Sequence, residues 1–379
     1  MESVSVEGII LLTERIEQYQ ERLVRELYSM GYRMAGSYLK QIVTKIGRVC
    51  FRVVKLWKPS RRGVVSPILD ALHIRRIRYA RDVRMLCVDL ASRLSYGDAE
   101  KEIKKTNGLK IPKRTIHSFV QEVAPQLKKV NDQAVKHEGL QMVVMGDGTK
   151  VRSIYASDNE VHVAIAYSPE GGSKTLLQAS VNKPWEMVGG FHILVCDADR
   201  STMLNLAYEE TAIQLDIVHA VKETLIKLWS QGMGKEERDK VSMEMKGILH
   251  TLVNSTRKHS LDGDMSALNK RIEQTLRELD MLSKKLLREG YLKASYFIKK
   301  NAKLMVTFAK LLTLGVKIPY TSNTIERLMG EVAKRCKHRW AHWSTQGLEN
   351  ILQIILIRYT REEIYEAFWK TYIHPSRQL

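Results

Sequence analysis

Apolar residues recur at three- and four-residue steps near the start of the chain, with charged residues between them. The members of this stripe are Ile9, Leu12, Ile16, Tyr19, Leu23, Leu27 and Met30. That period is typical of an amphipathic helix, so we predict helix over residues 5–45. A short β-strand is expected at residues 47–54 and a loop at 58–63, where Pro, Ser and Gly gather.

Residues 70–130 carry the helical period again and are rich in Lys and Arg. Residues 95–103 are expected to form a capped helix, which Asn107 and Gly108 end before a second helix starts near Pro112. This pattern is typical of a helix-turn-helix, and Lys113, Arg114 and His117 are its candidate DNA contacts. Plain helical hairpins share the pattern, so the charge of the chain has to support the DNA-binding interpretation.

The pattern changes after residue 140, where short apolar runs replace the long helical stripes. The predicted strands cover residues 141–147, 160–167, 175–181, 191–197 and 212–218, with a helix at 202–210. The first three strands follow one another directly, and a fourth strand, a helix and a fifth strand come after them. This order predicts a mixed α/β sheet.

Residues 220–318 predict almost unbroken helix up to Pro319. They include an apolar stripe of Leu268, Ile272, Leu276, Leu279, Leu282 and Leu286 that is expected to pack in a core. Helix resumes from about residue 323 and is interrupted near residues 340–343. We therefore predict an N-terminal helical and β region at 1–70, a helix-turn-helix domain at 71–138, and an α/β domain at 139–379 with an all-α insertion.

The charge balance points to a polyanionic partner. The 379 residues include 61 Lys and Arg but 42 Asp and Glu, a net charge of +19. Basic residues are spread through folded-looking sequence, which favours a globular protein with basic faces for nucleic acid over a ribosomal or membrane-surface protein. No apolar segment is long enough to cross a membrane, no signal peptide is recognisable, and a cytoplasmic, nucleoid-associated protein is expected. The four cysteines form no CxxC pair and are expected to be reduced and buried.

Three acids are candidates for metal-dependent chemistry. Asp147 and Asp197 both end apolar runs of strand length. Acids at the ends of neighbouring strands can converge and hold hard cations such as Mg²⁺. Each acid also has a simpler interpretation: Asp147 could lie in a Gly-Asp-Gly turn, Asp197 could cap a helix, and Glu326 could complete a capping box with Asn323.

The order of these motifs resembles one known family. The motifs are Asp147-Gly-Thr149, Asp197, Asp216-Ile-Val-His219, a long helical insertion, and Ser322-Asn-Thr-Ile-Glu-Arg327, followed by a stretch from Trp340 to Gly347. Together they resemble the Mutator-like prokaryotic insertion-sequence transposases of the RNase H-like DDE superfamily, over roughly residues 70–360. Relatives often have Gly after the second acid, whereas this chain has Ala198, and Asp199 competes for that role.

The resemblance implies an RNase H-like catalytic core in which Asp147, Asp197 and Glu326 are the catalytic metal ligands. It implies Mg²⁺ as cofactor, with Mn²⁺ as a substitute, and supporting roles for Asp216, His219 and Asn323. The expected activity is strand cleavage and strand transfer at the ends of an insertion sequence. The expected partners are double-stranded DNA, both terminal repeats and target, and further copies of the chain, with no membrane.

Two points remain open. Basic residues follow Glu326, and phosphate contact or a plain solvated face would both explain them; the candidate contacts are Arg327, Lys334, Arg335 and Arg339. The alternatives to a transposase are a catalytically inactive or domesticated transposase-derived DNA-binding protein, and a structure-selective nuclease of the same superfamily.

Overall fold

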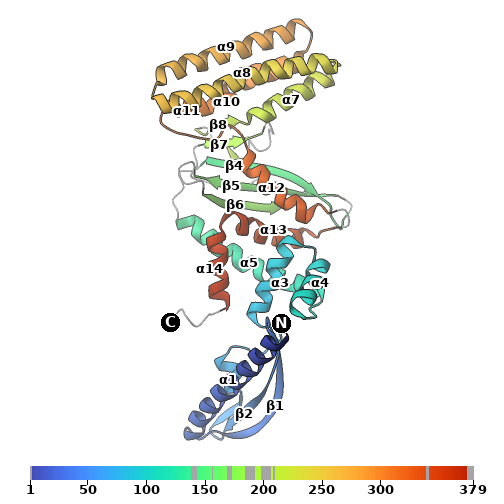
Figure 1. The fold of residues 1–379 in the computed structure, drawn as a ribbon, viewed down its shortest axis with the longest axis vertical. Coiled ribbons are helices and arrows are strands. Elements are labelled where there is room, and N and C mark those ends of the chain that lie inside the picture. The colour runs from blue at the N-terminus through green and yellow to red at the C-terminus, as the bar shows by residue number, and fades with distance from the viewer. Residues whose placement is uncertain are drawn as a thin grey trace. The chain divides into compact units, whose positions relative to one another are not determined.

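The computed structural model describes residues 2–137, 143–155, 157–168, 173–183, 193–197, 206–207, 210–338 and 341–373. The protein is mixed α/β, with a three-stranded antiparallel sheet and a five-stranded mixed sheet (Figure 1). Its residues group into two compact units, one formed by 1–126 with 366–379 and the other by 127–365. The predicted boundary between residues 70 and 71 falls inside the first unit, and the predicted boundary at 138 lies outside the described residues.

The first unit begins with helix α1 (Glu2–Ser29), followed by strands β1 (Arg33–Thr44), β2 (Gly47–Lys58) and β3 (Arg61–Val65). The helix predicted for residues 5–45 is therefore correct through residue 29 and wrong for β1. Gly31 takes a φ of 84° just after α1, which favours glycine and lets the chain turn back. Beyond it, β1 pairs along its length with β2, so long-range hydrogen bonding decides its structure.

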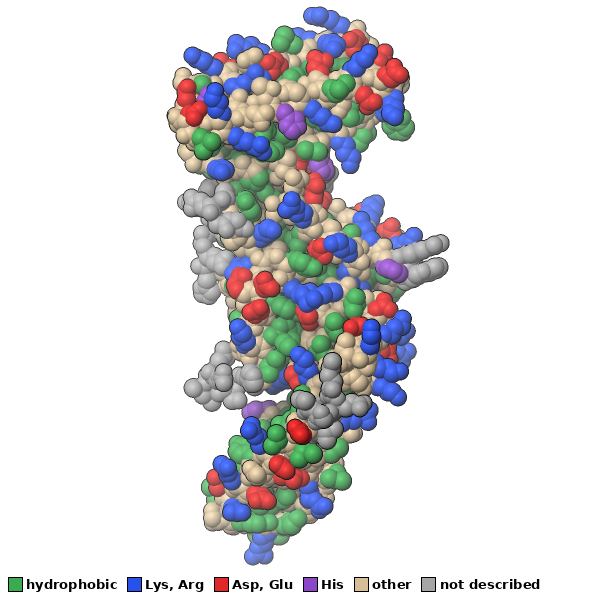
Figure 2. Space-filling view, viewed as in Figure 1, with side chains coloured by type: hydrophobic (Ala, Val, Ile, Leu, Met, Phe, Trp, Pro, Cys, Tyr) green, Lys and Arg blue, Asp and Glu red, His purple; other side chains and the backbone are tan. Residues whose placement is uncertain are grey.

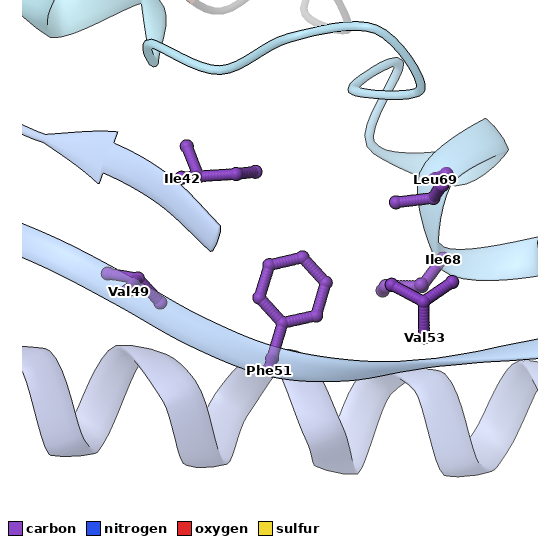
Figure 3. Packing of buried hydrophobic residues seen from close by; sticks show 6 residues of the cluster. All are labelled: Ile42, Val49, Phe51, Val53, Ile68 and Leu69. Carbon is purple, nitrogen blue, oxygen red and sulfur yellow. The ribbon is translucent and has the colours of Figure 1, made fainter. Parts of the chain in front are cut away.

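A small core holds this part of the first unit together. It consists of Ile42, Val49, Phe51 and Val53 from the sheet with Ile68 and Leu69 from helix α2 (Pro67–Ala71) (Figure 3). The apolar stripe of α1 packs against the same cluster. The segment expected to be a loop at residues 58–63 is the hairpin turn between β2 and β3 together with the start of β3.

The predicted helix-turn-helix region forms helices α3 (Arg81–Arg93), α4 (Tyr96–Asn107) and α5 (Lys113–His137). The Ser95 hydroxyl caps α4 by accepting from the Asp98 backbone N–H at 3.1 Å. Gly108 ends α4 with a left-handed φ of 65°, as its position after Asn107 indicated. The last helix, α14 (Glu362–Ile373), returns to this unit, where Arg81 donates to the Tyr372 carbonyl at 2.9 Å.

The second unit contains the five-stranded sheet. Its strands are β4 (Val143–Val151), β5 (Asn159–Tyr167), β6 (Lys174–Val181), β7 (Ile193–Cys196) and β8 (Ala212–Leu215), in the order β6-β5-β4-β7-β8. β4, β5 and β6 are antiparallel, whereas β7 and β8 run parallel to β4. All five predicted strands are present, but the one predicted at 212–218 ends at Leu215 because Asp216 caps α7, and the one predicted to end at residue 147 continues to Val151. The helix predicted at 202–210 lies almost wholly outside the described residues.

Helices follow the sheet. α7 (Ile217–Ser230), α8 (Lys235–Asp262), α9 (Met265–Arg288), α10 (Leu292–Met305) and α11 (Thr307–Thr313) form the predicted insertion, whose surface mixes both signs of charge (Figure 2). The stripe of α9 is buried there at Leu268, Ile272, Leu279, Leu282 and Leu286. α12 (Asn323–Cys336) then packs on β4, and α13 (Thr345–Thr360) packs on β6.

No helix among the described residues combines the length and the apolar character that a membrane span requires. Cys87, Cys196 and Cys336 are buried as expected, whereas Cys50 is exposed on β2, so that part of the cysteine prediction is wrong.

Candidate metal-binding site

Three aspartates lie at one level of the parallel part of the sheet. The register pairs Met145 of β4 with Val195 of β7, and Cys196 of β7 with Leu215 of β8. Carrying both registers onward places Asp147, Asp197 and Asp216 side by side. Asp147 does not end its strand, because β4 continues to Val151 and pairs Asp147 with Val163, so the turn interpretation is wrong. The pairing of β4 with β7 ends two residues before Asp147, at Met145 and Val195.

The Asp147 carboxyl lies in an environment that opposes its ionisation. Burial raises the pKa of Asp147 from 3.8 to about 6, and the charges of Asp197 and Glu326 raise it as well. The Gly148 backbone N–H, which donates to Asp147 Oδ1 at 2.7 Å, and His219 act in the opposite direction. The structure therefore brings Asp147, Asp197 and Glu326 within electrostatic reach of one another. A bound cation would relieve the repulsion among three such carboxylates.

Asp216 is fully buried and its oxygens are already used. Oδ1 accepts from the backbone N–H groups of Val218 at 2.6 Å and His219 at 2.9 Å, which caps α7. Oδ2 accepts from the Ser322 backbone N–H at 2.6 Å and lies 2.8 Å from the Ser322 hydroxyl. Asp216 is thus a structural link between the start of α7 and the start of α12.

Glu326 projects from the first turns of α12 toward His219. Its Oε1 lies 2.8 Å from His219 Nε2 and 3.1 Å from the Ser322 hydroxyl. That hydroxyl has one proton for two acceptors, Asp216 and Glu326, so it can donate fully to only one of them. The capping-box interpretation is not supported, because Ser322 rather than Asn323 is the N-cap of α12 and its side chain makes no capping bond.

Two groups of residues could hold a metal ion. Asp216, His219 and Glu326 offer ligand atoms within 4.8 Å of one another. Each Asp216 oxygen already accepts two hydrogen bonds, which a metal ion would have to displace from the oxygen it bound. The Asp147 carboxylate accepts only from the Gly148 N–H among the described contacts. We therefore favour Asp147, Asp197 and Glu326 as the ligands, an all-oxygen set suited to Mg²⁺ or Mn²⁺. His219 then lies beside the set and orients Glu326.

The other residues at the start of α12 and after β7 differ in how far the structure describes them. Asn323 is exposed at the start of α12 and makes no hydrogen bond to a described residue, so its supporting role has no contact behind it. Asp199, the rival second ligand, lies outside the described residues. Ser322 is the first residue of the Ser-Asn-x-x-Glu-Arg motif, but the sequence predicted no role for it. No pattern in the neighbouring sequence indicates that its hydroxyl lies within hydrogen-bonding distance of Asp216 and Glu326.

The basic residues after Glu326 do not share one face. Arg327 and Lys334 are exposed, and Lys334 pairs with Glu331 at 2.6 Å. Arg335 is only 6% exposed, with its guanidinium 4.9 Å from the centre of the Trp343 ring. Its predicted phosphate contact is therefore wrong, because packing between α12 and the Trp343 segment removes it from solvent. Arg339 lies outside the described residues.

Lys337 was given no specific role from the sequence. Its Nζ hydrogen-bonds the hydroxyl of Thr149, two residues beyond Asp147 on β4.

In the first unit, the predicted DNA contacts Lys113, Arg114 and His117 are all exposed on the first two turns of α5. His117 packs edge-on against Tyr96, with ring centres 5.3 Å apart.

Trp343 belongs to the core of the second unit. It is 6% exposed, and its indole N–H donates to the Cys336 carbonyl at 3.1 Å. This burial identifies Trp343 as a core residue. Trp340 lies outside the described residues.

Comparisons with protein families and with curated proteins found no match.

Proposed function

We propose that this protein is a DDE-type DNA transposase whose second unit is an RNase H-like catalytic core. The observation that carries the proposal is the convergence of Asp147, Asp197 and Glu326. The register of β4 and β7 aligns the first two, and the charges of Asp197 and Glu326 add to burial in raising the pKa of Asp147. The sheet order β6-β5-β4-β7-β8 supports the fold assignment, because β4 lies at the centre with Asp147 on it. The long helical insertion between β8 and α12 supports the family resemblance.

The donor set fits the chemistry of phosphodiester cleavage. Two Mg²⁺ ions held by these carboxylates would activate the attacking oxygen and stabilise the leaving one. The protein needs no nucleophile of its own, since its task is to position DNA and the carboxylates. Asp216 and Ser322 hold the starts of α7 and α12 together, and His219 holds the Glu326 carboxylate in place. Exposed Lys and Arg side chains hold the DNA phosphates, and copies of the chain assemble on the DNA ends.

A cleavage assay tests the proposal. Labelled duplexes carrying the DNA that flanks the coding sequence would be incubated with Mg²⁺ or Mn²⁺ and with the wild-type protein, Asp147→Asn or Asp158→Asn. Asp158 is exposed and just precedes β5, so it is a matched control. We expect Asp147→Asn to bind DNA normally and lose cleavage, and Asp158→Asn to retain both.

Each other outcome has a definite meaning. Continued cleavage and joining by Asp147→Asn would show the metal-site assignment to be wrong. Wild-type cleavage without transfer of a 3′-OH to target DNA would identify a nuclease of the same superfamily. Tight binding to the flanking repeats with no cleavage would identify a transposase-derived DNA-binding protein.

A further inference from the structure

Charge is strongly segregated within the first unit. α1 carries six Glu and three Arg. The sheet segment 33–65 that follows contains nine Lys and Arg and no Asp or Glu. Figure 2 shows acidic side chains over α1. A sheet without any acid offers no ion-pair partner of its own to its cations, so their charge can be neutralised only by groups outside the sheet.

One face of this sheet is bare. The cross-strand pairs Leu39 with Arg52 and Gln41 with Cys50 are exposed on it, and Leu39 is 74% exposed. The alternate residues Ile42, Val49, Phe51 and Val53 point to the other face and form the core (Figure 3). A two-stranded antiparallel ribbon such as the β1–β2 hairpin can enter the major groove of duplex DNA.

A small cavity lies at one end of the bare face. It has a volume of about 50 Å³ and is lined by Gln41, Val43, Arg48, Arg78, Tyr79, Leu109 and Lys110. Hydrogen bonds from Val43 N–H to the Arg78 carbonyl (2.9 Å) and from Ala80 N–H to the Val43 carbonyl (2.8 Å) fix the Arg78 segment against β1. Lys110 comes from the turn between α4 and α5. Three chain segments thus bring cations to one place.

The lining of this cavity suits a single phosphate. Arg48, Arg78 and Lys110 supply positive charge, Gln41 supplies an amide donor, and no acid is among the lining residues. None of the three cations is in an ion pair with a described residue. The volume exceeds the roughly 10–15 Å³ that a cavity needs to hold one water but is far below the several hundred Å³ of a drug-sized ligand site.

We propose that this cavity binds a backbone phosphate of duplex DNA, and that the bare sheet face extends the DNA contact from the helix-turn-helix onto the sheet. The proposal rests on the proposed function only in taking DNA as the partner. Because Lys110 lies in the helix-turn-helix turn, a phosphate held here would fix the register of α5 on the duplex. Such contacts position a protein without reading sequence.

The test measures DNA binding by the full chain without metal, so that no cleavage interferes. Fluorescence anisotropy with a duplex of unrelated sequence would be followed from about 50 to 200 mM KCl. The test variant is Arg48→Ala/Arg78→Ala/Lys110→Ala. The control is Arg15→Ala/Arg22→Ala/Arg25→Ala, which removes the same charge from exposed positions on acidic α1.

We expect the test variant to bind roughly ten-fold more weakly and to lower the slope of log K against log salt by about 1. The control should change neither quantity by a comparable amount. A charge-retaining variant, Arg48→Lys/Arg78→Lys, should recover most of the affinity, which separates loss of charge from loss of folding. Equal weakening by the test and control variants, or an unchanged slope, would overturn the inference. The experiment measures DNA binding and not strand cleavage. It can therefore support the phosphate site even if the protein proves to have no transposase activity, and it can reject the phosphate site even if the protein is a transposase.

Discussion

Asp147 is the candidate metal ligand whose ionisation the folded structure changes most clearly. Its pKa is raised to about 6 from 3.8, so the folded state holds the proton more tightly than the unfolded chain. The free energy of unfolding therefore falls as pH rises from about 4 to about 6, and the full penalty of the charge is present above that range. A divalent cation would relieve this penalty, which comes first from burial of the Asp147 carboxyl and then from the charges of Asp197 and Glu326.

We accordingly expect Asp147→Asn to stabilise the metal-free protein at pH 7 by about 1–3 kcal/mol, because it removes the buried charge. Urea unfolding with EDTA at pH 4 and pH 7 would measure this, and the gain should disappear at the lower pH. Added Mg²⁺ should stabilise the wild type and leave the variant unchanged. Destabilisation of the variant at both pH values would contradict the assignment of Asp147 as a strained ligand.

Ser322 provides a second prediction at this scale. Its hydroxyl lies between Asp216 and Glu326, at 2.8 and 3.1 Å. Ser322→Ala leaves one oxygen of Asp216 with a single partner, so we expect a loss of about 1–2 kcal/mol of stability. We also expect slower strand cleavage with unchanged DNA affinity, since Glu326 loses one of its two anchors. Ser157→Ala, at an exposed serine, is the control. Cleavage at the wild-type rate would remove Ser322 from the positioning of Glu326.

At the scale of the element, most helices and strands follow from the local pattern. The α9 stripe is buried as its spacing predicts, and α4 ends at Gly108 because that residue takes a left-handed φ. β1 is the exception, because its apolar residues at 34, 35, 38, 39, 42 and 43 follow helical steps of three and four, whereas pairing with β2 makes it a strand. α12 is a partial exception, because its basic residues lie on several faces and Arg335 turns inward.

The burial of α9 makes a direct prediction. Leu279 is completely buried in the insertion, so Leu279→Ala should cost about 2–5 kcal/mol through lost contacts and a residual cavity. Leu287 lies on the same helix but is 51% exposed, and Leu287→Ala should cost far less. Chemical denaturation of both variants would measure the difference. Equal losses would mean that the α9 stripe does not face the core of the insertion.

At the scale of the whole molecule, two compact units share one chain. Each has its own hydrophobic cluster, around Phe51 in the first and around Leu194 in the second. We expect two transitions in scanning calorimetry, of which Mg²⁺ shifts only the one belonging to residues 127–365, since its candidate ligands all lie there. Asp147→Asn should abolish that shift. A single transition that Mg²⁺ moves as a whole would show that the units unfold together.

The sequence by itself determined the order of strands and helices apart from β1 and β3, most of the breaks between them and the identity of the candidate acids. These depend on side-chain period and turn chemistry, which act over a few residues. Only the tertiary structure decided what those acids contact. Asp216 meets Ser322 across 106 positions and His219 meets Glu326 across 107, distances over which no local pattern carries information. Packing likewise decided that Asp147 stays within a strand, that Arg335 is buried, and that Arg48, Arg78 and Lys110 surround one cavity.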